Sequence, residues 1–398
     1  MLSLYRGLVA GLLLAGLAAL CMDSATVSAQ DKKDPKGKTA KEEVAERGTS
    51  VSTSDGLTLK GYWFQGVAID KNRPDAVIMV PAPGNKINES WIWLAKALSE
   101  KNFSVLLFDW RGCGLNGPEG VGSGVGILED KTRFWEEPYN GTFLRTQRGI
   151  IEKRGLDYSR LLSAGNDRGR YRDFMFMNDL QGARFFIDQQ NDAGKCNSNR
   201  TWIISEKDGS HLGLAFMAAE FQRNTIYDPK NNFLDFNKQF RSAGKDYVGM
   251  MSLSYSASGI SSGTANKIFA NALPSLGANE AVKDARDHLK DRLAMVLMYK
   301  KGDNGPSRSL LNSVGTSTTD VALLKDMYKY PKEFDIKAAK PIAGIDLIDP
   351  SDTFKVKEYV ITAMVEISKK SPIGKAPTDR EASKMLTPPR FPVEKFLR

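Results

Sequence analysis

The chain has 398 residues, a formal net charge of +9 at pH 7 and an apolar share of 41%. This length and apolar content exclude a wholly disordered chain and suffice for one large α/β domain with insertions or two small domains, while three cysteines are too few for a disulfide framework. No compact block of Lys and Arg occurs, so we expect no nucleic-acid partner, and the positive charge indicates either affinity for acidic polymers or lipid headgroups or a surface suited to solubility.

The N-terminus has the pattern of a secretory signal peptide over residues 1–29. Arg6 precedes an apolar run from Leu8 to Cys21, and Val27-Ser28-Ala29 is a small-residue cleavage site. Lipidation at Cys21 stays open as an alternative, although the residue before it is larger than such processing favours. We expect an exported protein, periplasmic or extracellular. No later segment has the apolar length of a transmembrane helix.

The mature chain begins with a polar segment and a hairpin pattern. Residues 30–48 are charged and nearly free of large apolar side chains, so we expect a disordered tether. Apolar and polar residues then alternate over 49–66 around the turn Asp55-Gly56, which predicts a β-hairpin.

Strand and helix patterns alternate after the hairpin. Apolar runs that predict buried parallel strands lie at 76–80, 104–110, 201–205, 247–254 and 294–299. A last strand is expected within 334–348, followed by a helix at 356–367. One expected helix carries apolar residues on a single face, at Trp91, Leu94, Ala95 and Leu98. At least five alternations predict a mostly parallel sheet with helices on both faces, and ligands of such sheets bind beyond the carboxyl ends of the strands.

Two segments interrupt or end this alternation. Residues 117–172 begin rich in glycine and continue with aromatic and charged residues, so we expect an insertion. It is either a cap over a pocket or a surface elaboration that packs on its own aromatics. Residues 369–398 are basic and proline-rich, which predicts a loosely packed tail. Cys113 follows one strand and Cys196 precedes the next, so we expect no disulfide between them.

The segment from Thr201 to Ala218 reads TWIISEKDGSHLGLAFMA, an apolar strand, a turn of small and polar residues and an apolar helix. A catalytic nucleophile can be held on such a strand–turn–helix elbow, with small residues two positions before and after it. The small residues here are Ser205 and Gly209, which places Lys207 at the nucleophile position.

Three segments, in this order, resemble the α/β-hydrolase superfamily. They are the hairpin GLTLKGYWF before VIMVPAPG, the strand SVLLFDWRGCGLN with its Asp-x-Arg-Gly-x-Gly pattern, and the elbow; MVLMYKKGD near residue 300 adds a match to the strand that carries the acid. The resemblance implies an α/β-hydrolase-like fold over residues 49–368, with the insertion after the DWRGCG strand.

The resemblance also implies positions for a catalytic triad. The nucleophile position falls on Lys207, and the acid position falls on Asp303. The histidine position falls around Pro341 to Ile345, where no histidine occurs. Of the two histidines, His211 lies four residues past Lys207 on the same helical face, and His288 precedes its strand. Serine attack needs a base for the hydroxyl proton, so both halves of that transfer are missing.

The role of Lys207 has two interpretations. A desolvated lysine at a helix N-terminus can act as an amine nucleophile. Alternatively, Lys207 is an ordinary charged group in an ion pair with Glu206, Asp208 or Asp303.

Ser261 is an alternative nucleophile, because Gly259 to Gly263 form a literal G-x-S-x-G pattern. Five residues separate this pattern from the strand ending at Leu253, whereas an elbow requires the strand to run directly into the turn. The glycines of VGSGVG near residue 124 do not follow a strand directly, and no His, Cys and Asp cluster has zinc spacing. We therefore expect neither a cofactor nor a metal.

The resemblance places the oxyanion-binding amides at Ala82 and Asp208. Pro83 removes one N–H donor, and the Asp208 carboxylate would oppose negative charge nearby. Both details are typical of a site that no longer performs acyl transfer.

Three hypotheses follow for function. In the first, the protein is a pseudoenzyme that binds a small molecule or an envelope component in the former cleft. In the second, it is an active esterase- or peptidase-like hydrolase with a rearranged site drawn from Lys207 or Ser261, Asp303 and His211. In the third, the basic tail attaches the protein to acidic envelope polymers.

Overall fold

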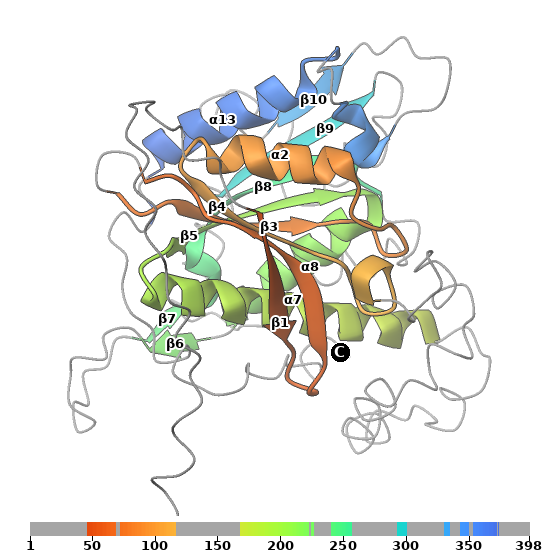
Figure 1. Cartoon of the computed structure of the whole chain (residues 1–398), viewed down its shortest axis with the longest axis vertical. Helices are drawn as coiled ribbons and strands as arrows, with labels where there is room; N and C mark the ends of the chain where they lie inside the picture. The colour runs from red at the N-terminus through yellow and green to blue at the C-terminus, as the bar shows by residue number, and fades with distance from the viewer. Residues whose placement is uncertain are drawn as a thin grey trace, which may run out of the picture. The chain divides into compact units, whose positions relative to one another are not determined.

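A computed structural model describes residues 46–68, 72–116, 168–222, 224–226, 240–256, 293–300, 330–334, 343–349, 353–371 and 373. These residues include an eight-stranded sheet with the strand order β1-β2-β4-β3-β5-β8-β9-β10 (Figure 1). The pairs β1–β2 and β2–β4 are antiparallel, and the remaining neighbours are parallel. The expected mostly parallel sheet is confirmed.

The elements have the following bounds. The strands of the large sheet are β1 Glu46–Ser52, β2 Thr58–Phe64, β3 Asp75–Val80, β4 Phe103–Phe108, β5 Asn197–Glu206, β8 Tyr247–Leu253, β9 Ala294–Lys300 and β10 Tyr330–Phe334. A separate two-stranded sheet contains β6 Asn224–Ile226 and β7 Phe240–Ser242. The helices are α2 Glu89–Ser99, α7 Arg168–Asp192, α8 Lys207–Gln222 and α13 Val356–Lys370, with 3-10 turns at Gly114–Asn116, Ala243–Asp246 and Gly344–Leu347.

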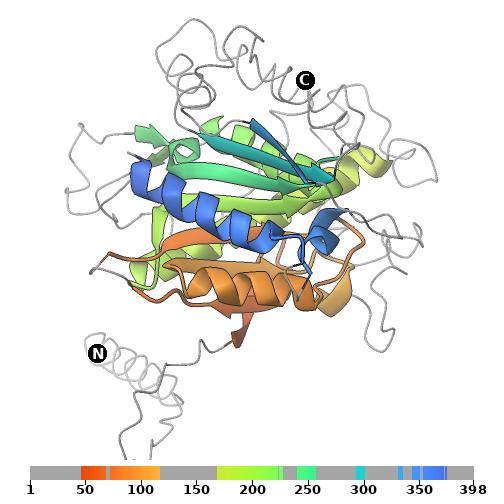
Figure 2. The same cartoon turned by 90° about the horizontal axis from the view of Figure 1, so that it is seen from above.

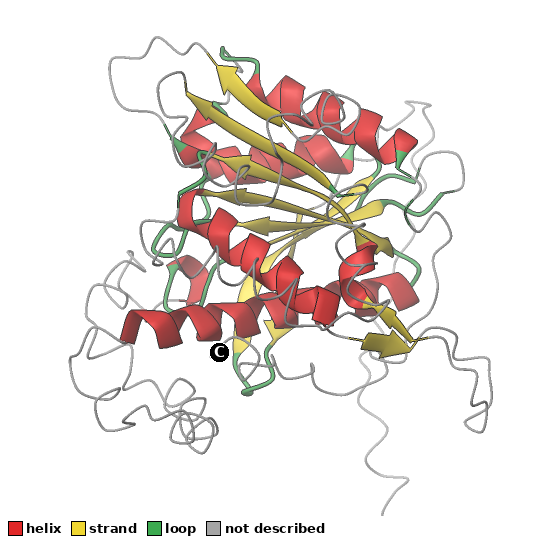
Figure 3. Ribbon diagram, turned by 180° about the vertical axis from the view of Figure 1, so that it is seen from behind, coloured by secondary structure: helices red, strands yellow, loops and turns green. Residues whose placement is uncertain are grey.

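The parallel strands bury both of their faces, each in its own hydrophobic cluster. In β3, for example, Ala76, Ile78 and Val80 face one cluster and Val77 and Met79 face the other. This alternation is the period-two geometry of a strand, and burial on both sides explains why the strands read as continuous apolar runs. Figure 3 shows the strands between helices on the two sides.

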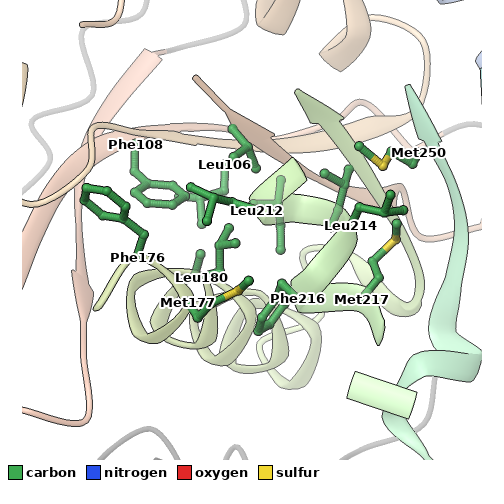
Figure 4. Packing of buried hydrophobic residues seen from close by; sticks show 14 of the residues in the cluster. Leu106, Phe108, Phe176, Met177, Leu180, Leu212, Leu214, Phe216, Met217 and Met250 are labelled. Carbon is green, nitrogen blue, oxygen red and sulfur yellow. The ribbon is translucent and has the colours of Figure 1, made fainter. Parts of the chain in front are cut away.

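The two clusters are closed by different helices. Helices α2 and α13 lie side by side over one face (Figure 2). In α2, the buried apolar residues are Trp91, Leu94, Ala95 and Leu98, as the helical spacing predicted. Helices α7 and α8 cover the other face, where α8 packs between α7 and the sheet (Figure 4). The side chains shown there include Phe176 and Leu180 of α7, Leu212 and Phe216 of α8, and Leu106 and Phe108 of β4.

The Asp-x-Arg-Gly-x-Gly segment after β4 ties distant elements together. The buried Arg111 guanidinium donates to Asp179 of α7 at 2.8 Å and to Asp55 of the β1–β2 turn at 2.7 Å. The Asp109 carboxylate accepts the N–H groups of Ile87 and Leu115, both at 2.9 Å. The specific sequence match therefore corresponds to a structural junction of the hairpin, β4 and α7.

Cys113 and Cys196 are buried and are not joined by a disulfide, as expected. Within the described residues, no helix has both the length and the apolar character needed to cross a bilayer. The expected signal peptide, tether, insertion and tail lie wholly or almost wholly outside those residues.

Beyond Phe334, the described part of the range 334–348 does not form the expected last strand, and residues 335–342 lie outside the described residues. β10 covers Tyr330–Phe334, and Gly344–Leu347 form a 3-10 turn. The apolar residues that suggested a strand, Ile345 and Leu347, are buried against the sheet instead. β10 is an edge strand, where a proline such as Pro331 is tolerated because one side needs no ladder hydrogen bonds.

Candidate functional site

The elbow between β5 and α8 has Lys207 at its turn. β5 ends at Glu206 and α8 begins at Lys207, whose φ of +44° lies in the left-handed region that side chains rarely adopt. Gly209 packs so closely on the end of β3 that a Cβ there would lie 2.4 Å from the Pro81 carbonyl oxygen. The strand therefore runs directly into a sharp turn and a helix, as a nucleophile elbow requires.

The Lys207 side chain is half-buried at this turn. In the described part of the chain, no ion pair joins it to Glu206 or Asp208. The Glu206 carboxylate instead accepts hydrogen bonds from other groups. Asp303, the third proposed partner, lies outside the described residues.

The Glu206 carboxylate is fully buried beside the turn. One oxygen, Oε1, accepts the backbone N–H of Ala82 at 3.1 Å and the Asn85 amide at 3.0 Å. The other, Oε2, accepts the backbone N–H of Ile345 at 2.7 Å. The Ala82 amide, which the resemblance assigned to an oxyanion, is therefore already bonded to a carboxylate of the chain.

The range in which a histidine was expected, Pro341 to Ile345, includes Gly344, which lies against the elbow; residues 341 and 342 lie outside the described residues. The φ of Gly344 is +70°, and a Cβ there would lie 2.2 Å from Glu206 Oε2 and 2.8 Å from Lys207 Cε. Any side chain at Gly344 would need both a strained backbone and a displaced Glu206.

His211 lies in α8, with only 1% of its surface exposed. Its Nδ1 is 3.2 Å from the Tyr255 hydroxyl, and its Nε2 has no hydrogen-bond partner among the residues that the structure describes. Burial lowers the pKa of His211 to about 4, although the Asp208 carboxylate acts in the opposite direction. Burial also raises the pKa of Tyr255. Both groups are therefore neutral at pH 7.

The end of β8 lies next to the elbow. Glu206 and Leu253 are paired in register, so Lys207 and Ser254 are the first residues after the two strands. Ser254 also has a left-handed backbone, with φ of +55°, and its buried Oγ has no hydrogen-bond partner in the part of the chain that the structure describes. The Ser256 N–H donates to the Lys207 carbonyl at 3.4 Å. Ser254 Oγ and His211 Nε2 are thus buried polar atoms without a described partner at this edge of the sheet.

The structure brings together some of the predicted site residues. Ala82, Lys207, Asp208 and His211 lie on the elbow or the segment next to it, whereas Asp303 and Ser261 lie outside the described residues. Within the described residues, no group of His, Cys, Asp and Glu side chains could hold a metal ion.

Sequence reasoning missed Glu206, Asn85 and Tyr255. Glu206 carried a usable signal, since an acid between an apolar strand and the elbow must be either exposed or bonded to polar groups. Asn85 and Tyr255 carried none, because their partners are distant in sequence.

Comparisons with known proteins give structural likenesses only. No family model matches the sequence, and no curated protein matches it. The chain is similar to brefeldin A esterase, a bacterial homologue of human hormone-sensitive lipase, at 10% identity and a TM-score of 0.45, covering 85% of this chain and 81% of that one. It is also similar to a dienelactone hydrolase from Anabaena variabilis, at 13% identity and a TM-score of 0.38, covering 83% and 99%. A third is Thermogutta terrifontis esterase 2, at 10% identity and a TM-score of 0.42, covering 84% and 97%.

The assignment of the fold rests on the architecture of the chain itself. A mostly parallel sheet lies between helices on both faces, and its central strand β5 ends in a sharp turn before α8. The chain has an α/β-hydrolase-like fold, with Lys207 at the sharp turn between β5 and α8.

Proposed function

We propose that this protein is exported, binds a ligand at the carboxyl edge of its sheet, and performs no serine-hydrolase chemistry at the elbow. The observation that carries the proposal is the environment of the turn: a lysine at the nucleophile position beside a carboxylate that already occupies the Ala82 amide. Attack by serine requires a hydroxyl, a base and free oxyanion donors.

The groups around the turn support the absence of a nucleophilic hydroxyl, of a base and of free oxyanion donors. The elbow offers an amine in place of a hydroxyl, and the range expected to carry a base, Pro341 to Ile345, contains no histidine. His211 has its Nδ1 beside the Tyr255 hydroxyl, within hydrogen-bond distance. A negative charge that developed on a substrate next to Ala82 would meet the charge of Glu206 rather than an unoccupied donor.

Binding is supported by the polar groups at the carboxyl edge of the sheet. Open α/β sheets bind ligands beyond the carboxyl ends of their strands. At that edge Ser254 Oγ and His211 Nε2 are buried and have no hydrogen-bond partner among the described residues, and buried polar groups are almost always hydrogen-bonded, to protein, water or ligand. A neutral polar group of a ligand would match them, since His211 is uncharged at pH 7.

The test is intact-mass analysis of the purified protein after exposure to a fluorophosphonate probe. An active serine esterase, treated in parallel, shows that the probe reacts. We expect no adduct on this protein, with circular dichroism showing that it is folded. A stoichiometric adduct on one serine would overturn the proposal.

The alternative is an active hydrolase with a rearranged site, and one observation favours it. The strained turn of an elbow is retained at Lys207, and strain of this kind is common at functional sites. Turnover of p-nitrophenyl esters by the wild type that disappears in Lys207→Ala or Ser261→Ala would establish this alternative.

A further inference from the structure

Three N–H donors from separate segments converge on one carboxylate beside the elbow. The Ala82 N–H and the Asn85 side-chain amide come from the loop after β3, and the Ile345 N–H comes from the turn before α13. They bind both oxygens of Glu206, at 3.1, 3.0 and 2.7 Å. We call these three donors the carboxylate nest.

The backbone around the nest is shaped to an anion. Gly344 has φ of +70°, and the space a Cβ would need is occupied by Glu206 Oε2. Glycine is thus required there for two separate reasons, the left-handed backbone and the close approach of the carboxylate. Charge-assisted bonds from amide N–H groups to a carboxylate are about twice as strong as neutral ones, so the donors suit an anion better than water.

We propose that the carboxylate nest is a binding site for a small carboxylate, which the chain itself fills with Glu206. If Glu206 is shortened to alanine, the nest accepts free acetate or formate. The fit follows from volume: the atoms removed by Glu206→Ala beyond Cβ are a methylene and a carboxylate, the heavy-atom skeleton of acetate. This inference goes beyond the proposed function, because it concerns an anion site beneath the turn and not the ligand of the cleft.

The experiment measures the melting temperature of Glu206→Ala while acetate or formate is titrated at constant ionic strength with chloride. We expect a melting temperature well below that of the wild type, and a saturable rise with either carboxylate. At ten times the dissociation constant the rise should be about 2 °C. Trimethylacetate, which carries the same charge on a bulkier body, should give no rise.

Three proteins serve as controls. The wild type should not respond, because its nest is filled. Glu206→Gln keeps the volume but presents an N–H₂ to the donors, so it should melt below the wild type and gain nothing from acetate. Leu180→Ala, which leaves a cavity in the cluster on the opposite face of the sheet from Ile345, should be destabilised without carboxylate rescue.

The outcomes separate clearly. A rise for Glu206→Ala that is specific to acetate and formate supports the nest. An equal response to chloride, or none, overturns it. If Glu206→Ala does not fold alone, its recovery on refolding is measured with acetate and with chloride. Recovery only with acetate supports the nest, and equal recovery overturns it. A fluorophosphonate adduct would contradict the proposed function but would not affect the carboxylate response of Glu206→Ala.

Discussion

The backbone of Lys207 is left-handed, a conformation that most residues with a Cβ avoid. A left-handed φ costs a residue with a Cβ roughly 1–2 kcal/mol relative to the ordinary helical region, and glycine escapes most of this cost. The hydrogen bonds of Glu206 and the close contact of Gly209 with Pro81 hold the turn in place. The strain at Lys207 is therefore imposed by its neighbours.

Lys207→Gly should unfold at a higher urea concentration than Lys207→Ala. Both variants remove the amine, but only glycine relieves the left-handed strain, so we expect a difference of about 1 kcal/mol in the free energy of unfolding. Equilibrium urea unfolding measures it. A Lys207→Gly protein less stable than Lys207→Ala would show that the turn is not strained as described.

His211 should make stability depend on pH. In the folded protein its imidazole stays neutral down to about pH 4, whereas in the unfolded chain it binds a proton below about 6.5. The unfolded state therefore gains protons first, and stability falls as pH falls from about 6.5 to 4, by on the order of 3 kcal/mol. Above this window the contribution is fully present.

The measurement is urea unfolding of the wild type and of His211→Asn between pH 4 and 7.5. Asparagine can still hydrogen-bond the Tyr255 hydroxyl but does not titrate, so the variant should lose less stability than the wild type on acidification. Parallel pH profiles for the two proteins would contradict the assignment.

At the scale of elements, Arg111 is the junction of three segments. It bridges Asp55 in the β1–β2 turn and Asp179 in α7, and all three side chains are almost inaccessible to solvent. Removing one member of a buried ion pair leaves the other charge without compensation, which costs about 3–5 kcal/mol. The junction therefore matters to the docking of the hairpin on α7.

Arg111→Met should lower the free energy of unfolding by about 3–5 kcal/mol. Adding Asp55→Asn and Asp179→Asn should restore much of the loss, because the uncompensated charges are then gone. Arg73→Met is the matched control: this half-buried arginine donates to the Asn191 carbonyl and should cost only about 1 kcal/mol. No recovery in the triple variant would show that Arg111 acts through packing instead.

At the scale of the molecule, we propose export through the N-terminal segment. Cleavage at the small-residue site should give a mature protein that begins at Gln30. Expression of the full chain in a bacterium, followed by fractionation and N-terminal sequencing, tests this. Full-length protein that remains in the cytoplasm would contradict export, and a diacylglyceryl-modified Cys21 would favour the lipoprotein alternative.

Attachment through the basic tail is a second proposal for the whole molecule. Residues 369–398 should increase retention on an anionic matrix at low salt, because a segment of net positive charge attracts acidic polymers. The comparison is with a variant in which the Lys and Arg residues of the tail are replaced by Gln, which removes the charge and keeps the length of the chain. Equal retention of the two proteins would count against the attachment.

The architecture could be predicted from the sequence alone. The expected apolar strands and the expected helical face are confirmed in β3, β4, β5, β8, β9 and α2. They could be predicted because the spacing of apolar residues within a short stretch of sequence indicates the type of element and its buried face. The elbow was located in the same way, since an apolar strand, a small-residue turn and an apolar helix are neighbours in sequence.

The surroundings of the elbow depend on tertiary contacts that the sequence does not reveal. The bonds from Ala82 and Ile345 to Glu206 join residues 124 and 139 positions apart, and the Arg111–Asp179 bond spans 68. Local periodicity reports which face of an element is buried, but not which distant donor meets a given carboxylate. The last strand was misplaced for a related reason: Ile345 and Leu347 are buried by a 3-10 turn that packs on the sheet, and burial alone does not distinguish that from a strand.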